Sequence, residues 1–233
     1  MSANPYCYKY PRPALTADCV VFATAEDEGL QLLLIRRGGE PFRGQWALPG
    51  GFVNMDEDLH AAALRELEEE TGFHPARLEQ IGAYGRPDRD PRGRVITIAF
   101  LALVRRPDDP VRGGTDAEEA AWFPADQLPP LAFDHALLIE DARAMLRQRI
   151  RREPIGLDLL PQAFTLSQLQ SVYEAALGAP LDKRNFRKKI LRFDVLKELT
   201  GRRQTGHQRP AQLYAFDRAA YKRLQKQGID FEC

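Results

Sequence analysis

Residues 65–70 read RELEEE, a segment in which four of six side chains are acidic. Glu66, Glu69 and Glu70 have the i, i+3, i+4 spacing that places side chains on one face of a helix. Three carboxylates on one face repel each other, and Arg65 neutralises only part of that charge through a bidentate pair. Mg²⁺ and Mn²⁺ prefer carboxylate oxygens and leave positions open for water and phosphate. The cluster is therefore either a divalent-metal site or a solvated helix face, as in many Glu-rich helices.

The residues around the cluster favour the metal site. Gly51 is followed after five residues by Glu57, and after seven more by the run Arg65-Glu66-Leu67-x-Glu69-Glu70-x-Gly72-Phe73. This long pattern with fixed gaps resembles the Nudix box at every defined position. The preceding segment LLLIRRGGEPFRGQWALPGGF and the later segment WFPADQLPPLAFDH also resemble the ADP-ribose-type branch of the Nudix hydrolases. The resemblance covers nearly all of residues 12–150.

The resemblance implies an activity and a set of roles. Nudix hydrolases cleave a nucleoside diphosphate linked to another moiety, by attack of water on a phosphorus. We therefore expect Mg²⁺ (or Mn²⁺) as cofactor, and we expect Arg65 to orient the carboxylates. Glu57 either steadies the turn before the helix or joins the metal shell. The expected metal ligands are the backbone carbonyl of Gly51, Glu66, Glu69 and Glu70. The expected catalytic residues are Glu57, Arg65, Glu66, Glu69 and Glu70.

The box alone does not determine the substrate, so we take the candidate substrate-binding residues from the segments around it. Trp46 either stacks on an adenine or is a half-buried aromatic near a turn. Arg36 and Arg37 end a predicted strand, and strict alternation lets only one of them face the site. The arginines of GRPDRDPRGRV either reach phosphates or lie in a solvated loop, and we expect His135 to be a structural partner. The substrate-binding candidates are Arg36, Arg37, Trp46, Gly50, Gly51, Phe52 and Arg89.

A second set of chemically distinctive residues lies near the C-terminus. Residues 182–192 carry six Lys and Arg side chains. Phe186 and Ile190 are spaced to anchor a helix on the preceding one, which leaves Arg184, Asn185, Lys188 and Lys189 available on the outward side. An apolar underside with outward Arg, Lys and Asn is typical of a helix that reads DNA. The alternative is a basic, solvated subdomain that extends or dimerises an enzyme.

The turn TGRRQTGHQRP after this helix is the predicted wing of a winged helix-turn-helix. The segments FTLSQLQSVYEAALGAPLDKRNFRKKIL and RPAQLYAF resemble the C-terminal domain of the Nudix-related transcriptional regulators of NAD metabolism. Those regulators sense ADP-ribose or a related nucleotide and bind operator DNA as dimers. Many of them have a degenerate box, whereas this box is complete, so retained hydrolysis is expected. The DNA-binding candidates are Lys183, Arg184, Asn185, Arg187, Lys188, Arg202, Arg203, His207 and Arg209.

Composition and element order agree with two domains. The chain has 233 residues, of which 44% are hydrophobic. Residues 1–150 carry 17 Lys and Arg against 24 Asp and Glu, a net charge of −7, and the remaining residues carry 16 against 9, a net charge of +7. Such asymmetry suggests different partners for the two halves. We predict a Nudix domain over residues 1–152 and a DNA-binding domain over residues 153–233.

The predicted elements would hold both sites in place. Two apolar runs, ADCVVFAT and LQLLLIRR, form a hairpin, and a glycine-rich loop leads to the box helix, with Asp56 as its N-cap and Gly72 at its end. Later strands and the amphipathic helix FDHALLIEDARAMLRQRIRR complete an α/β (α+β) sandwich with a mixed sheet. In the smaller winged helix-turn-helix, Thr165 and Asp182 cap two helices, and Gly178 ends the first.

Location and assembly are also predicted. Three widely spaced cysteines form no metal or disulfide pattern, and no apolar run is long enough to span a membrane, so we expect a cytoplasmic protein. The leading hypothesis is a homodimeric transcriptional regulator that binds ADP-ribose and operator DNA and retains Mg-dependent pyrophosphatase activity. The alternative is a plain Nudix hydrolase of ADP-ribose or dinucleotides whose C-terminal domain serves dimerisation.

Overall fold

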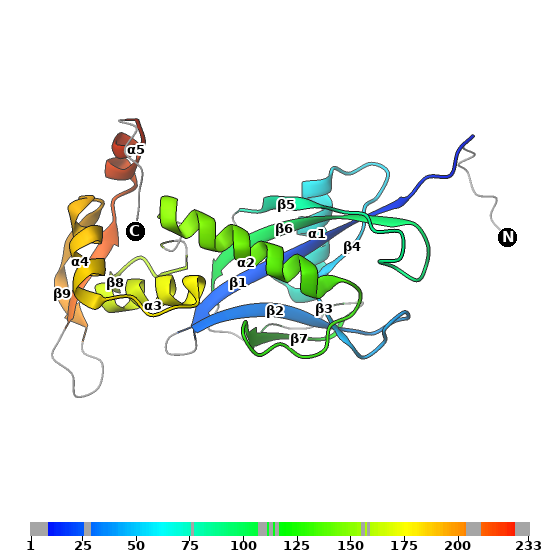
Figure 1. Cartoon of the computed structure of the whole chain (residues 1–233), viewed down its shortest axis with the longest axis horizontal. Helices are drawn as coiled ribbons and strands as arrows, with labels where there is room; N and C mark the ends of the chain where they lie inside the picture. The colour runs from blue at the N-terminus through cyan, green and yellow to red at the C-terminus, as the bar shows by residue number, and fades with distance from the viewer. Residues whose placement is uncertain are drawn as a thin grey trace.

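The protein folds into a large mixed sheet covered by helices, followed by a winged helix-turn-helix, as predicted (Figure 1). No helix in the described part of the chain is long and apolar enough to cross a membrane. The computed structural model describes residues 9–25, 29–75, 77–106, 111, 114, 117–154, 157, 159–203 and 211–226.

The mixed sheet is organised around a long parallel strand pair. β1 and β6 run parallel from Ala14 opposite Val95 to Thr24 opposite Arg105. β2 pairs antiparallel with β1 and with β7, β5 pairs antiparallel with β6, and the short strands β3 and β4 pair with β2 and β1. The elements of this part are β1 (Ala14–Ala25), β2 (Gly29–Arg37), β3 (Trp46–Ala47), β4 (Gly50–Phe52), α1 (Leu59–Thr71), β5 (Glu79–Tyr84), β6 (Val95–Arg105), β7 (Ala117–Pro124) and α2 (His135–Arg152).

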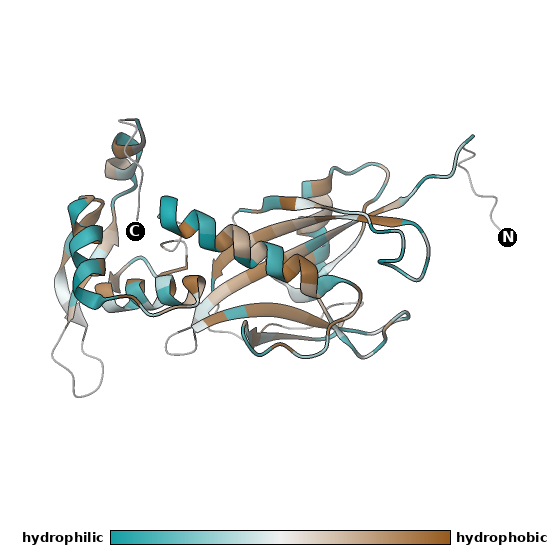
Figure 2. Cartoon of the chain, in the orientation of Figure 1, coloured by the Kyte–Doolittle hydropathy of each residue, from teal (hydrophilic) through white to brown (hydrophobic). Residues whose placement is uncertain are grey.

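Side-chain alternation along β1 divides the interior into two cores. Val20 and Phe22 face α2, where they join a cluster with Leu146. Val21 faces the opposite side and packs in a cluster with Leu67 of α1. The two helices therefore cover opposite faces of the sheet, and the strands between them are largely hydrophobic (Figure 2).

The ends of α1 show which sequence signals were correct. Asp58 caps the helix, because its carboxylate accepts the backbone N–H groups of His60 and Ala61 at 2.8 Å each. The prediction of Asp56 as the N-cap is therefore wrong by two positions, since residues 55–57 form a turn in place of helix. The predicted stop at Gly72 is confirmed, because this residue has φ 68 and donates its N–H to the carbonyl of Glu68.

The winged helix-turn-helix follows residues 153–163. Thr165 and Gln168 form the predicted capping box at the start of α3, Gly178 ends that helix with φ 69, and Asp182 caps α4. Its small sheet has the order β8-β10-β9. The elements of this part are β8 (Phe164–Thr165), α3 (Leu166–Leu177), α4 (Lys183–Arg192), β9 (Leu196–Arg203), β10 (Ala211–Phe216) and α5 (Arg218–Lys226).

The winged helix packs directly on the sheet and α2. α3 contacts both α2 and β2, and Leu169 and Tyr173 of α3 belong to the same buried cluster as Leu146 of α2. The hydroxyl of Thr24 in β1 donates to the carbonyl of Leu159 at 2.9 Å. One apolar core therefore continues from the sheet through α2 into the winged helix.

Four elements were not predicted. β3 and β4 lie within the glycine-rich segment that was expected to be a loop, and β8 and α5 lie in the C-terminal part. The three strands have only two or three residues each, which is too short for a periodic pattern.

Candidate functional site

A cleft of about 740 Å³ lies beside the N-terminal half of β1 and the C-terminal end of β2. Its lining includes residues of β1, β2, β4, β7 and α1, residues 38–40, the loop of residues 89–92, and Phe133 and His135 at the start of α2. Glu66 and Glu70 of the box line this cleft together with Asp18, while the carboxylate of Glu69 is half exposed. The box helix therefore presents its acidic face to a cavity and not only to bulk solvent.

Glu70 is the most deeply placed box glutamate. Its side chain accepts the backbone N–H of Gly50 at 2.8 Å, and the residue is 7% exposed. Burial, together with the negative charges of Glu66 and Asp18, raises the pKa of Glu70 to about 8. Burial likewise raises the pKa of Glu66 above its usual value. These carboxylates thus lie close together in a place where a positive charge would stabilise their ionised forms.

The two glycines before the box helix allow this close approach. A Cβ atom on Gly51 would lie 2.5 Å from both carboxylate oxygens of Glu66, and a Cβ atom on Gly50 would overlap the backbone of β1. Gly50 also has φ 155, a backbone conformation that residues other than glycine rarely adopt. The loop backbone and the α1 carboxylates can therefore meet only because both positions lack a side chain.

Arg65 holds the acidic residues as predicted. Its guanidinium donates to Glu57 at 2.9 and 2.6 Å, to Glu66 at 2.7 Å and to Glu69 at 3.2 Å. Glu57 also accepts the N–H of Asn54 at 2.7 Å, and its hydrogen bonds with Arg65 and Asn54 lower its pKa to about 2. Of the two roles considered for Glu57, the turn-stabilising role matches these contacts.

The donor set fits a hard divalent cation. In the part of the chain that the structure describes, no three His, Cys, Asp or Glu side chains converge as ready-made metal ligands. Arg65 instead engages Glu66 and Glu69. The carboxylate oxygens of Glu66 and Glu70 nevertheless adjoin the bare backbone of Gly51 and Gly50, which is the oxygen-rich surrounding that Mg²⁺ prefers.

Arg89 is engaged by two carboxylates. It donates to Asp134 at 3.1 and 2.8 Å and lies 3.8 Å from Asp18, and its side chain is 3% exposed. Asp18 in turn accepts a hydrogen bond from the hydroxyl of Thr97 at 2.5 Å. Arg89 therefore lines the cleft but ties its loop to the start of α2. Asp18 was not predicted, although a carboxylate within the apolar run ADCVVFAT was a detectable signal.

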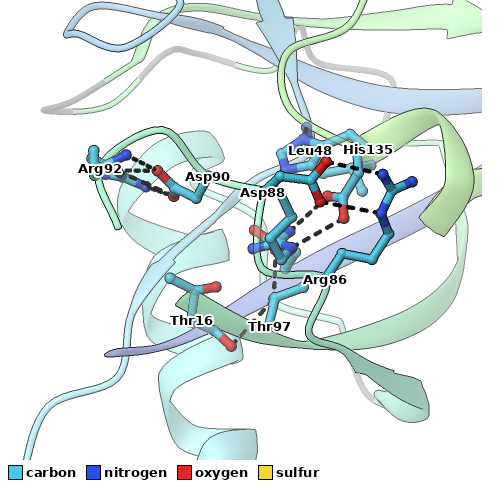
Figure 3. Close-up of polar contacts among 11 residues, drawn as sticks. Thr16, Leu48, Arg86, Asp88, Asp90, Arg92, Thr97 and His135 are labelled. Carbon is cyan, nitrogen blue, oxygen red and sulfur yellow. Dashed lines mark hydrogen bonds and ion pairs between the residues drawn. The ribbon is translucent and has the colours of Figure 1, made fainter. Parts of the chain in front are cut away.

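His135 is the structural partner that its position suggested. It is buried, and its Nδ1 accepts the backbone N–H of Leu48 at 2.9 Å (Figure 3). Burial lowers the pKa of His135, which favours the neutral imidazole that this hydrogen bond requires. The first turn of α2 is thereby fixed to the loop that leads to Gly50.

Of the two adjacent residues Arg36 and Arg37, only Arg37 faces the cleft. Arg37 lines it, whereas Arg36 lies outside, where it donates to the carbonyl of Gly44 at 3.2 Å and lies 3.9 Å from Glu119. Trp46 is not part of the cleft lining either. Its ring packs edge-on against Phe123 at 4.7 Å, which matches the half-buried structural role.

Two further residues line the cleft: Arg92, which was among the loop arginines considered as phosphate contacts, and Phe133, which was not predicted. Arg92 is paired with Asp90 and lies over the ring of Phe52, a predicted substrate contact, at 4.8 Å. Phe133 lies close to the guanidinium groups of both Arg37 and Arg92. By contrast, Arg86 pairs with the exposed Asp88 outside the cleft lining (Figure 3). Only tertiary folding distinguishes the cleft-lining arginines of this loop from the solvated ones.

The basic helix α4 has the predicted two-sided character. Phe186 and Ile190 are buried, and Phe186 packs edge-on against Tyr173 of α3 at 5.2 Å. Arg184 and Lys188 are exposed, and most of the α4 ribbon has the hydrophilic colour (Figure 2). The other exposed members of this set are Lys183 and Asn185.

The remaining DNA-binding candidates differ in their placement. Arg187 is partly buried and donates to the hydroxyl of Ser167 at 3.2 Å. The backbone of Arg202 and Arg203 lies in β9. His207 and Arg209 fall outside the described residues.

Comparisons with known proteins identify both domains. Residues 13–142 match the family described as NUDIX domain, and residues 156–216 match the family described as NrtR DNA-binding winged helix domain. The chain is similar to the ADPR responsive transcriptional repressor NtrR of Acinetobacter baylyi, with 38% identity over 213 residues, which cover 89% of this chain and 83% of that protein.

Two other similarities are informative. The ADP-ribose pyrophosphatase of Methanocaldococcus jannaschii is 42% identical over 132 residues, which cover 57% of this chain and 74% of that protein. The crystal structure of Shewanella oneidensis NrtR complexed with a 27mer DNA matches with a TM-score of 0.75 and 34% identity, over 89% of this chain and 95% of that chain.

The contact between Gly51 and Glu66 generates a prediction. Gly51→Ala pushes the Glu66 carboxylate aside, and because that group ends a flexible side chain, folding is largely unaffected. We expect the affinity for Mg²⁺ or Mn²⁺ to fall about 10- to 100-fold, as when a group that orients a metal ligand is lost. Calorimetric titration with either ion measures this. Gly85→Ala, at a position with room for a Cβ, is the matched control. Equal affinities of the Gly51 variant and the parent would contradict the assignment.

Proposed function

The chain belongs to the Nudix family, as one of its NrtR-type transcriptional regulators, and on this premise we propose that it is an ADP-ribose-responsive repressor. The Nudix domain binds ADP-ribose or a related nucleotide, and the winged helix binds operator DNA. The observation that carries the proposal is the presence, in one chain, of a complete box that faces a cleft and an exposed basic helix in a winged helix. By the resemblance, genes of NAD metabolism are the expected targets.

Hydrolysis of ADP-ribose is a second proposed function of the same cleft. It is supported by the complete box and by the similarity to a pyrophosphatase. A bound Mg²⁺ or Mn²⁺ ion supplies neutralisation of the diphosphate and activation of water. Glu66, Glu70 and the Gly51 carbonyl would hold the ion, with Glu69 beside them.

Other residues of the box and the cleft position these groups or form the ligand surface in this proposal. Arg65 fixes the carboxylates of Glu66 and Glu69, and Glu57 fixes Arg65. Arg89 holds the cleft loop against Asp134, and Phe52 and Arg37 contribute to the surface that the ligand meets. Binding and orientation by these residues meet the main requirement of phosphoryl chemistry, which is a correctly placed and neutralised diphosphate.

DNA binding is assigned to the exposed face of α4 and to the wing. Arg184, Asn185 and Lys188 are free of the contacts that bury Phe186 and Ile190, so they are available to base edges and phosphates. One helix of this length reads a short site, and two copies related by a twofold axis read a palindromic operator. We therefore infer that the protein acts as a homodimer.

The helix α2 is the proposed link between the two functions. Its first turn is fixed beneath the cleft by the pairs Asp134–Arg89 and His135–Leu48. Its later turns share a core with α3. In this proposal α2 takes two positions, and a ligand that binds one of them more tightly shifts the protein toward that position. The affinity for DNA changes to the extent that DNA also binds the two positions differently.

The exposed box glutamate provides a test of hydrolysis. Glu69→Gln removes one carboxylate charge beside the ion without removing a buried contact, so we expect the formation of AMP and ribose 5-phosphate to fall on the order of 100-fold in Mg²⁺. Glu68→Gln is the matched control, because Glu68 lies on the same helix, is exposed and is 3.4 Å from His74. Unchanged product formation in the Glu69 variant would refute a catalytic metal site.

The recognition helix provides a test of DNA binding. A duplex ligand is first obtained by selection from a random double-stranded library. Arg184→Ala combined with Lys188→Ala should weaken its binding roughly 30-fold or more, as measured by fluorescence anisotropy, and leave hydrolysis intact. Arg43→Ala combined with Arg77→Ala removes the same charge from exposed positions near the sheet and serves as control. If no duplex is selected, or both double variants bind alike, the C-terminal domain serves dimerisation and the repressor proposal fails.

A further inference from the structure

Arg37 of β2 and Arg92 of the loop after β5 lie against the same aromatic ring. Their guanidinium carbons are 4.9 and 5.5 Å from the ring centroid of Phe133, and all three residues line the cleft. Burial, and next the charge of Arg92, lower the pKa of Arg37. Two like charges are therefore held close enough to repel each other, and the negative charges of Glu70, Asp90 and Asp18 offset part of that repulsion.

Each of these arginines is anchored through part of its guanidinium. Arg37 donates Nε to the carbonyl of Pro41 at 2.8 Å. Arg92 donates Nε and Nη2 to the carboxylate of Asp90, at distances from 2.6 to 3.2 Å. Among the described residues, neither Nη group of Arg37 nor Nη1 of Arg92 has an assigned hydrogen-bond acceptor. Both side chains thus keep donors for a ligand while their positions are fixed.

The neighbouring arginines contrast with this pair. Arg65 distributes its guanidinium among three glutamates and the carbonyl of Phe52. Arg89 has a 3% exposed side chain that is held by Asp134 and Asp18. The guanidinium groups of Arg65 and Arg89 are therefore engaged mainly by carboxylates of the protein. Arg37 and Arg92 use only part of their hydrogen-bond donors within the described residues.

The guanidinium of Arg92 is held by one ion pair and two aromatic rings. Asp90, whose side chain is 2% exposed, holds one edge of the guanidinium, and Phe52 and Phe133 lie against it at 4.8 and 5.5 Å. Phe133 has φ 54, a left-handed conformation that non-glycine residues adopt rarely and that occurs preferentially at functional sites. A planar guanidinium fixed in this way binds phosphate with little further loss of conformational entropy.

We propose that Arg37 and Arg92 form a phosphate-binding site that recognises the diphosphate of the ligand directly, without a metal ion. The inference rests on the proposed function and deepens it. Ligand recognition then depends on the two arginines, while cleavage depends on the carboxylates of α1. A protein built in this way senses ADP-ribose even when its metal site is empty.

The test measures ADP-ribose binding to the full-length protein by calorimetry, in Mg²⁺ and in EDTA. Arg92→Gln and Arg37→Gln should each weaken binding in EDTA about 10- to 100-fold, the usual effect of losing a charge-assisted hydrogen bond. Arg36→Gln is the matched control, because Arg36 is the adjacent residue and lies outside the cleft. It should leave the affinity within about twofold, since it removes the same charge without a ligand contact.

Competition by adenosine separates ligand contact from a structural role. Adenosine has no phosphate, so its affinity should be the same in the parent, Arg92→Gln and Arg37→Gln. An equal loss of adenosine and ADP-ribose binding would show a distorted cleft and overturn the proposal. Because Arg37 keeps only one anchoring hydrogen bond, its variant tests the idea even if Arg92→Gln unfolds.

The outcomes also separate this inference from the proposed function. If the parent binds ADP-ribose in neither buffer, the sensor function itself fails. If the parent binds in Mg²⁺ but not in EDTA, or if both Gln variants bind as the parent does, the sensor function stands and the arginine site is wrong.

Discussion

The crowding of carboxylates around Gly50 and Gly51 is the constraint on which the site depends. Asp18 and Glu70 are buried and Glu66 is only partly exposed, so water screens their charges poorly, and burial raises the pKa of Glu70 to about 8. The fold tolerates this arrangement because Gly50 and Gly51 permit the close approach and Arg65 forms ion pairs with Glu66 and Glu69. Negative charge on these carboxylates remains unneutralised by the protein, and a bound divalent cation would neutralise it.

The same cleft also contains the opposite charge, and the two sets of residues are built differently. The acids come from β1 and α1, whereas Arg37 and Arg92 rest on the rings of Phe52 and Phe133. The loop that carries Arg92 is tied through Arg89 to the start of α2, and α2 continues into the core of the winged helix. Ligand contacts, the cleft loop and the DNA-binding domain are therefore parts of one packed structure.

The sequence allowed the fold and the box to be predicted because both depend on local patterns. Gly72, Thr165, Gly178 and Asp182 end or begin helices as expected, since capping needs only neighbouring residues. Asp58 displaced Asp56 because the preceding turn, which spacing alone does not reveal, occupies residues 55–57.

Long-range contacts explain what was missed. Arg89 is saturated by Asp134, 45 positions later, and Asp18 reaches the cleft from β1, so neither role follows from local sequence. The choice between Arg36 and Arg37 needed the register of the sheet and the position of the cleft. Phe133 brings two arginines together only after α2 has packed on the sheet.

The central claim is that one ligand and one DNA site are energetically coupled through this structure. The most direct measurement is the affinity for ADP-ribose of the protein alone and of the protein saturated with its selected duplex. Linkage requires the two values to differ by the same factor by which ADP-ribose changes the affinity for the duplex, about 5- to 150-fold for typical coupling. Identical affinities for ADP-ribose with and without DNA would contradict the account.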